Sequence, residues 1–118
     1  MGEQIAAEHL LEAGYEILDR NWRVRDGELD LVVADAHAIV FCEVKTRVAG
    51  GRSGPALALD AVGPAKRRRV RHLAMAWLRD RRAEGGAPHR EHLRFDAIGI
   101  TISPGGRVLS LDHVTDAF

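Results

Sequence analysis

The chain has 118 residues, of which 46% are hydrophobic and 29% are charged. This size suits one domain over residues 1–118, and the composition is typical of a folded globular protein rather than a disordered segment. The formal net charge is zero and every apolar run is too short to span a bilayer, so we expect no membrane partner.

The first predicted element is a helix from Gly2 to Ala13, ended by Gly14. Glu3 begins a stripe of alanines and leucine at three- and four-residue spacing, so its side chain is expected to face the rest of the fold. Glu3 either favours the positive end of the helix dipole or serves as a functional carboxylate near the sheet. The glutamates of this segment also argue against a secretory signal peptide.

A first strand is predicted from Tyr15 to Val24, before a turn at residues 26–27. Strict alternation would place Leu18 and Trp22 on one side of this strand and Tyr15 and Asp19 on the other. We expect Trp22 to belong to the core.

Two further strands are predicted over residues 28–33 and 38–46, with a tight turn between them. If the loop is residues 36–37, Asp30 lies opposite Glu43 and Glu28 lies opposite Lys45, with directly opposed side chains about 5 Å apart. The other face of this hairpin then carries an apolar surface for a helix, made of Leu29, Leu31, Val33, Val40, Cys42 and Val44.

Two opposed carboxylates repel each other, so the pairing of Asp30 with Glu43 needs a reason, and a divalent cation supplies one. Lys45 adds an amine on the same face. The alternative is that each acid pairs with a nearby base, Glu43 with Arg47 or Asp30 with Arg23, on an ordinary solvated hairpin.

The lone cysteine, Cys42, falls on the apolar face and is expected to be a buried thiol, which fits a reducing, cytoplasmic compartment. Residues 48–62 contain several glycines and a proline, and we expect a long connection that borders the site, either a flap over substrate or a plain link.

A second helix is predicted from Pro64 to about Arg82, with a buried stripe that includes Val70 and Trp77. Its first turns are strongly basic and only Asp80 opposes that charge, whereas the rest of the chain is net acidic. Such a run is usually a solvated face, but its like charges favour a nearby anion such as a phosphate. The candidate phosphate-binding residues are Arg47, Lys66, Arg67, Arg68, Arg69 and Arg71.

A strand from Leu93 to Ile102 and another from Arg107 to Leu111 complete the chain, before a tail whose Phe118 packs back. The helical crossover predicts that the first of these strands is parallel to the strand before it, which gives a mixed sheet. Arg94 and Asp96 share a face and are expected to pair with each other or with Arg23, while the alternative places Asp96 in the site.

The segments that carry a family resemblance run through nearly the whole chain. They are residues 2–3, 14–15, 21–23, Gly27-Glu28-Leu29-Asp30, Phe41-Cys42-Glu43-Val44-Lys45-Thr46-Arg47, Arg94-Phe95-Asp96 and residues 117–118. Together they resemble the small bacterial YraN-type family, which is uncharacterised and similar in architecture to archaeal Holliday junction resolvases. Asp30 and Glu43-Val44-Lys45 also resemble the paired motifs of the PD-(D/E)XK nuclease superfamily, although Leu29 stands where the motif's proline would be.

This resemblance implies an α/β (α+β) fold with a restriction-endonuclease-like αβββαβ core and a mixed five-stranded sheet flanked by helices. It implies that Asp30, Glu43, the carbonyl of Val44 and Glu3 hold Mg²⁺ or Mn²⁺, and that Lys45 orients water or offsets phosphoryl charge. Glu28 would tune Lys45. The implied activity is metal-dependent hydrolysis of DNA, with structured or branched DNA among the substrates, by a chain that could form a homodimer.

Two other kinds of protein fit the sequence. One is a non-catalytic DNA- or RNA-binding module that keeps the nuclease fold. The other is an interaction protein in which the hairpin acids complete a surface network, and it explains the acid-x-lysine pattern least well.

Overall fold

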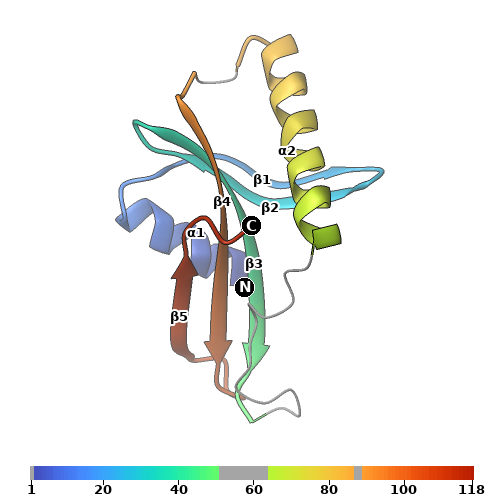
Figure 1. The fold of residues 1–118 in the computed structure, drawn as a ribbon. Helices are drawn as coiled ribbons and strands as arrows, with labels where there is room; N and C mark the ends of the chain where they lie inside the picture. Colours follow the sequence, from blue (N-terminus) through green and yellow to red (C-terminus); the bar gives the residue numbers. More distant parts are fainter. Residues whose placement is uncertain (1, 51–63, 87–88) are drawn as a thin grey trace.

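The computed structural model describes residues 2–50, 64–86 and 89–118, and Figure 1 shows how their elements are arranged. The elements run in the order α1 (Gly2–Glu12), β1 (Glu16–Val24), β2 (Gly27–Ala34), β3 (Ala38–Val48), α2 (Pro64–Ala83), β4 (His92–Ile102) and β5 (Val108–Val114). The predicted loop over residues 48–62 begins inside β3, and its part from residue 51 onward lies outside the described residues.

The five strands form one mixed sheet in the order β1-β2-β3-β4-β5. Strands β1, β2 and β3 form an antiparallel meander, β3 and β4 are parallel across the helical crossover as predicted, and β5 returns antiparallel to β4. The fold is therefore α+β with a five-stranded mixed sheet flanked by two helices, which confirms the predicted class.

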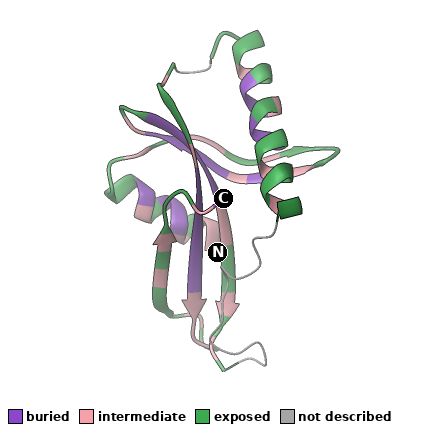
Figure 2. Ribbon diagram, viewed as in Figure 1, coloured by how far each residue is buried: buried purple, intermediate pink, exposed green. Residues whose placement is uncertain are grey.

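The two helices cover opposite faces of this sheet (Figure 1), and each covers its own core. Under α1, Ala7 and Leu10 pack against Leu31, Val33 and other buried strand residues. Under α2, Leu73 and Trp77 pack against a second set that includes Phe41. Figure 2 shows that the buried residues concentrate in the middle strands and on the inward sides of both helices.

Both faces of the hairpin are thus apolar where its two strands pair. The prediction of one apolar face was incomplete, because Val32, Ala34, Ile39 and Phe41 are buried under α2. It was wrong for Leu29, which packs with the α2 core instead of with Leu31 and Val33. Leu29 lies beyond the last residue pair that joins β2 to β3, where β2 continues beside β1 alone.

The strand β1 contains an irregularity that strict alternation missed. Its register with β2 shifts between Ile17 and Asp19, as a β-bulge does, so one extra residue changes which side chains share a face. Asp19 consequently accepts a hydrogen bond from Nε1 of Trp77 on α2, at 3.0 Å. The prediction that Asp19 shares a side with Tyr15 was therefore wrong, because Tyr15 packs with the α1 core.

Several end features follow the sequence closely. Gly14 adopts a φ of 96° just after α1, and the Tyr15 amide donates to the Leu10 carbonyl, as at a glycine-capped helix end. Phe118 is buried in the α2 core, and Cys42 is a buried free thiol. Neither described helix is long and apolar enough to cross a membrane.

Candidate functional site

The predicted acids meet where β2 separates from β3. Pairing between these strands runs from Ala34–Ile39 to Leu31–Cys42, in the register the sequence predicted, and ends one step before Asp30 and Glu43. Beyond this point a side-chain hydrogen bond links the two strands: Oδ2 of Asp30 accepts a hydrogen bond from the Val44 amide at 2.8 Å. Asp30 therefore sits in the fork between the two strands.

Asp30 lies in an environment that resists negative charge. Burial is the main reason why its pKa is raised from 3.8 to about 6, although the Val44 hydrogen bond opposes the shift. The charges of Glu3, Glu43 and Glu28 raise the pKa further. Glu3 on α1 and Glu43 on β3 thus both act electrostatically on Asp30, which places three of the predicted acids around one fork.

Two amines surround the carboxylate of Glu43. Lys45 of β3 has its Nζ atom 3.8 Å from Oε1 of Glu43, and Lys66 of α2 forms an ion pair with the same oxygen. The Lys45 side chain is 50% exposed, whereas those of Lys66 and Glu43 are 26% and 20% exposed. Lys66, predicted as one of several phosphate ligands, is thus the closer counter-ion of Glu43.

The first turn of α1 can lie close to β3 because residue 2 is a glycine. A methyl group at Gly2 would overlap Oγ1 of Thr46 on β3, so the backbone of α1 approaches β3 more closely than an alanine would allow. The next residue is Glu3, which explains how a helix residue reaches the site of the strands.

Asn21 is a site residue that sequence reasoning did not single out. It lies in β1 between Arg20 and Trp22, which pair with Leu31 and Leu29, so it lies beside Asp30. With its amide nitrogen facing Glu3, Asn21 donates to both Glu3 carboxylate oxygens, at 3.1 and 3.0 Å. Its φ of 49° is unusual inside a strand, and asparagine tolerates such an angle better than most residues with side chains. An asparagine in the middle of a predicted strand was the signal that the sequence offered.

Other predicted residues lie elsewhere or have other partners. Glu28 forms an ion pair with Arg23 at 2.9 Å, since β2 faces β1 at this position, and the prediction that it lies opposite Lys45 was therefore wrong. Arg71 donates to the Phe118 carbonyl at 3.1 Å and lies over the Phe95 ring, so its guanidinium supports the core.

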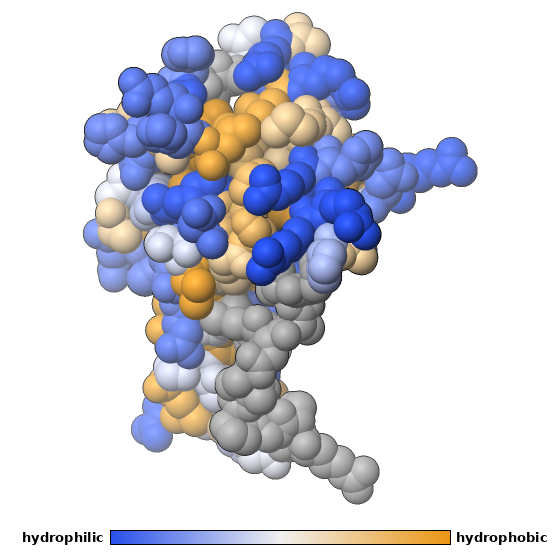
Figure 3. All heavy atoms as spheres, in the orientation of Figure 1, coloured by the Kyte–Doolittle hydropathy of each residue, from blue (hydrophilic) through white to orange (hydrophobic). Residues whose placement is uncertain are grey.

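Three arginines remain as the exposed basic surface that the sequence predicted. Arg67, Arg68 and Arg69 are all exposed on the first turns of α2. Figure 3 shows strongly hydrophilic side chains gathered over this part of the helix. Arg47 lies on β3, two residues after Lys45, and is partly buried.

Asp96 belongs to a separate buried network and not to the fork. It is fully buried, accepts two hydrogen bonds of 2.9 Å from Arg94, and lies 2.8 Å from Nε2 of His113. Burial alone would raise its pKa, but the bonds from Arg94, the Asp116 amide and His113 outweigh burial and hold the pKa below its usual value. The expected Arg94–Asp96 pair is confirmed.

The comparisons with known proteins agree over nearly the whole chain. The model of "Uncharacterised protein family UPF0102" matches residues 2–100. The chain belongs to the UPF0102 family. A UPF0102 protein of Rhodococcus jostii is 47% identical over 117 residues, covering 99% of this chain and 92% of that protein. A UPF0102 protein of Frankia casuarinae is 48% identical over 118 residues, with 99% and 92% covered.

A more distant member, from Mycobacterium bovis, is 42% identical over 118 residues and covers 97% of this chain and 86% of its own. The resemblance to the YraN-type family is therefore confirmed at the level of UPF0102. The names of these relatives assign no activity.

The carboxylate oxygens near the fork are the type of ligand that a hard cation such as Mg²⁺ prefers. Within the described residues, no three Asp, Glu, His or Cys side chains are grouped closely enough to hold a metal ion by themselves. Mg²⁺ does not need such a group, because it commonly binds one or two carboxylates and completes its shell with waters and substrate phosphates. The pKa of Asp30 is raised, so its ionised form is unfavourable in this environment, and a bound cation would stabilise that form. The donor set therefore fits.

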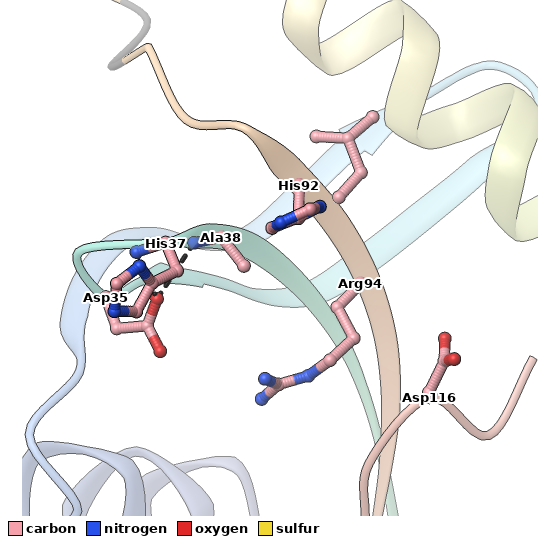
Figure 4. A pocket seen from close by; sticks show the side chains of 7 residues that line it. Asp35, His37, Ala38, His92, Arg94 and Asp116 are labelled. Atoms are coloured by element: carbon pink, nitrogen blue, oxygen red, sulfur yellow. Dashed lines mark hydrogen bonds between the residues drawn. The ribbon is translucent and has the colours of Figure 1, made fainter.

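A pocket of about 370 Å³ lies at a different place, near the turn between β2 and β3. Figure 4 shows its side chains coming from that turn, with Asp35 and His37, and from β4, with His92 and Arg94. The turn lies about five residues before Glu43 along β3, or about 16 Å at the rise of a strand. The pocket is therefore separate from the acidic fork.

Proposed function

We propose that this protein is a metal-dependent endonuclease of the PD-(D/E)XK type that hydrolyses phosphodiester bonds in DNA, including branched or structured DNA, in the cytoplasm. The observation that carries the proposal is the fork in which Asp30, with a pKa raised to about 6, lies beside Glu43. Lys45 follows two residues later. A half-buried carboxylate that is costly to ionise in the protein alone, with a second acid beside it, is better explained by a bound cation than by a surface network.

Asp30, Glu43 and the Val44 carbonyl would hold the cation, with Glu3 as a further oxygen donor. When bound, Mg²⁺ or Mn²⁺ polarises a phosphate and makes a coordinated water easier to deprotonate. The bond from the Val44 amide fixes the orientation of Asp30, since it occupies part of the carboxylate's acceptor capacity and leaves the rest for a ligand.

Lys45 supplies positive charge at the same edge of the fork. The Nζ of this half-exposed side chain can orient the attacking water, or it can donate to a phosphoryl oxygen and offset the charge that develops as the P–O bond breaks. Asn21 holds Glu3 with two hydrogen bonds, so Glu3 keeps one orientation toward the fork.

The exposed arginines of α2 would bind backbone phosphates beside the fork. Arg67, Arg68 and Arg69 lie on the helix that also delivers Lys66 to Glu43, so DNA held there would lie near the acids. Contacts with phosphates carry no base information, so we expect binding that depends on salt and not on sequence. A homodimer would suit a four-way junction, which presents two equivalent strands.

The test is cleavage of duplex, single-stranded and four-way DNA by the purified chain in Mg²⁺, Mn²⁺ or EDTA. We expect cleavage that needs the metal and is lost in Asp30→Asn and Glu43→Gln. Asp80→Asn, which alters an exposed acid on α2, is the matched control and should cleave normally.

A second candidate is a DNA-binding module without catalysis, and the ion pair between Lys66 and Glu43 favours it. In this arrangement Glu43 already has a cationic partner within the protein. DNA binding with no cleavage in either metal, unchanged in the two acid variants, would support the module over the enzyme.

A further inference from the structure

Lys66 differs from the arginines that follow it in the direction of its side chain. It starts a series with Val70 and Leu73 at the spacing of one helix face, and both of those residues contact the α2 core. The arginines at 67–69 are exposed, whereas the Lys66 side chain is only 26% exposed. Among the four consecutive basic residues 66–69, Lys66 is therefore the one whose side chain faces the sheet.

The helix that carries Lys66 is held in place by contacts far from the fork. Leu73 and Trp77 are buried against the strands, and Arg71 donates to the Phe118 carbonyl. Near the end of α2, Arg81 donates to the Leu18 carbonyl at 2.8 Å. The backbone position of Lys66 is thus set by the packing of the whole helix, and the flexible side chain carries the amine to Glu43.

The amine and a cation would compete for one atom. Lys66 pairs with Oε1 of Glu43, a carboxylate expected to hold the metal. A dication that binds this oxygen must displace the ammonium group or share the oxygen with it, and like charges make sharing unfavourable. A displaced Lys66 on a fixed helix remains beside the fork, where a phosphate oxygen of DNA could become its new partner.

We propose that Lys66 is a positioning residue that links cation binding to DNA binding. Resting on the proposed function, this inference assigns Lys66 two partners: Glu43 when DNA is absent, and a DNA phosphate when metal and DNA are both bound. The link is reciprocal, so the metal strengthens DNA binding by the same factor by which DNA strengthens metal binding. The protein alone is then a weak metal binder, and the site assembles fully on its substrate.

The experiment compares the full chain with its Lys66→Met, Lys66→Arg and Arg68→Met variants. Mn²⁺ is titrated into each DNA-free protein by calorimetry, and DNA affinity is measured by fluorescence anisotropy in EDTA and in Ca²⁺. Lys66→Met should bind Mn²⁺ about two- to fivefold more tightly than the natural protein, as expected for loss of a competing, partly exposed ion pair. The gain in its DNA affinity on adding Ca²⁺ should shrink by a similar factor.

The two other variants separate this role from a general effect of charge. Lys66→Arg keeps a cation at the position and should behave like the natural protein, which also shows that the site tolerates substitution. Arg68→Met removes an exposed charge and should weaken DNA binding while leaving Mn²⁺ affinity unchanged. Unchanged or weaker Mn²⁺ binding in Lys66→Met, or identical behaviour of Lys66→Met and Arg68→Met, overturns the inference while leaving the proposed function standing. No Mn²⁺ binding by either the natural protein or Lys66→Met, together with a DNA affinity that Ca²⁺ does not change, overturns both.

Discussion

Replacing Asp30 with asparagine should make the protein more stable at neutral pH. The pKa of Asp30 is about 6 in the folded chain, mainly because of burial, against an ordinary value of 3.8. Between these two values the folded protein binds a proton that the unfolded chain has released. Stability from this group is therefore present below about pH 4 and is lost as the pH rises through about 6.

The size of the effect follows from the same shift. A difference of about two pH units corresponds to about 3 kcal/mol, which is an upper limit because the fork can relax around the charge. Asparagine carries no charge at any pH, and its side-chain oxygen can still accept the hydrogen bond from the Val44 amide. Asp30→Asn should therefore remove the cost of the charge while keeping the bond.

Urea unfolding at pH 4, 5, 6, 7 and 8 gives the free energy of unfolding at each pH and tests the prediction. The free energy of unfolding of Asp30→Asn should match the natural protein near pH 4 and exceed it increasingly up to about pH 7. Asp80→Asn, which changes an exposed acid, should show no such trend. A variant that is less stable at pH 8, or a difference that does not change with pH, would refute the reasoning. Added Mn²⁺ should stabilise the natural protein and not Asp30→Asn.

Two further predictions concern the supports of the site and of the sheet. Gly2→Ala should lower stability by about 1 kcal/mol in thermal unfolding and reduce cleavage, because the added methyl group meets the Thr46 side chain. Asp96→Ala should cost about 3–5 kcal/mol, because it leaves Arg94 and His113 without their buried partner. Since hydrogen bonds hold the Asp96 pKa below 3.8, the stability that its carboxylate contributes is present above pH 4 and lost in stronger acid, and urea titrations of both proteins would show this difference.

The centre of the hairpin could be predicted because its turn chemistry and its pattern agree. Asp35 accepts hydrogen bonds from the His37 and Ala38 amides, which fixes a two-residue loop and with it the register of every later pair. The register from Ala34–Ile39 to Leu31–Cys42 was therefore readable from local sequence, and it ends one step before Asp30 and Glu43. The parallel pairing of β3 with β4 was also predictable, because a helical crossover requires it.

The structure departs from the predicted side-chain faces and partners where a backbone irregularity, or an element distant in the sequence, determines them. The bulge near Leu18 adds one residue to β1, and no local residue type announces it. The register could not reveal that β2 pairs with β3 only from Leu31 onward. Because residues 27–30 pair with no residue of β3, Glu28 forms its ion pair with Arg23 of β1 and not with Lys45. Asn21 escaped notice because its role depends on Glu3, which lies on another element.

The fork is assembled from five elements, and this explains why the two helices matter as much as the strands. Each helix contributes a charged residue from its first turn, Glu3 from α1 and Lys66 from α2, and each helix is fixed by its own apolar core. Repulsion among the acids would push α1 and the strands apart if nothing opposed it. Because the buried stripes of both helices oppose it, the charges stay close in the absence of any ligand, and a cation with a phosphate would meet a site already formed.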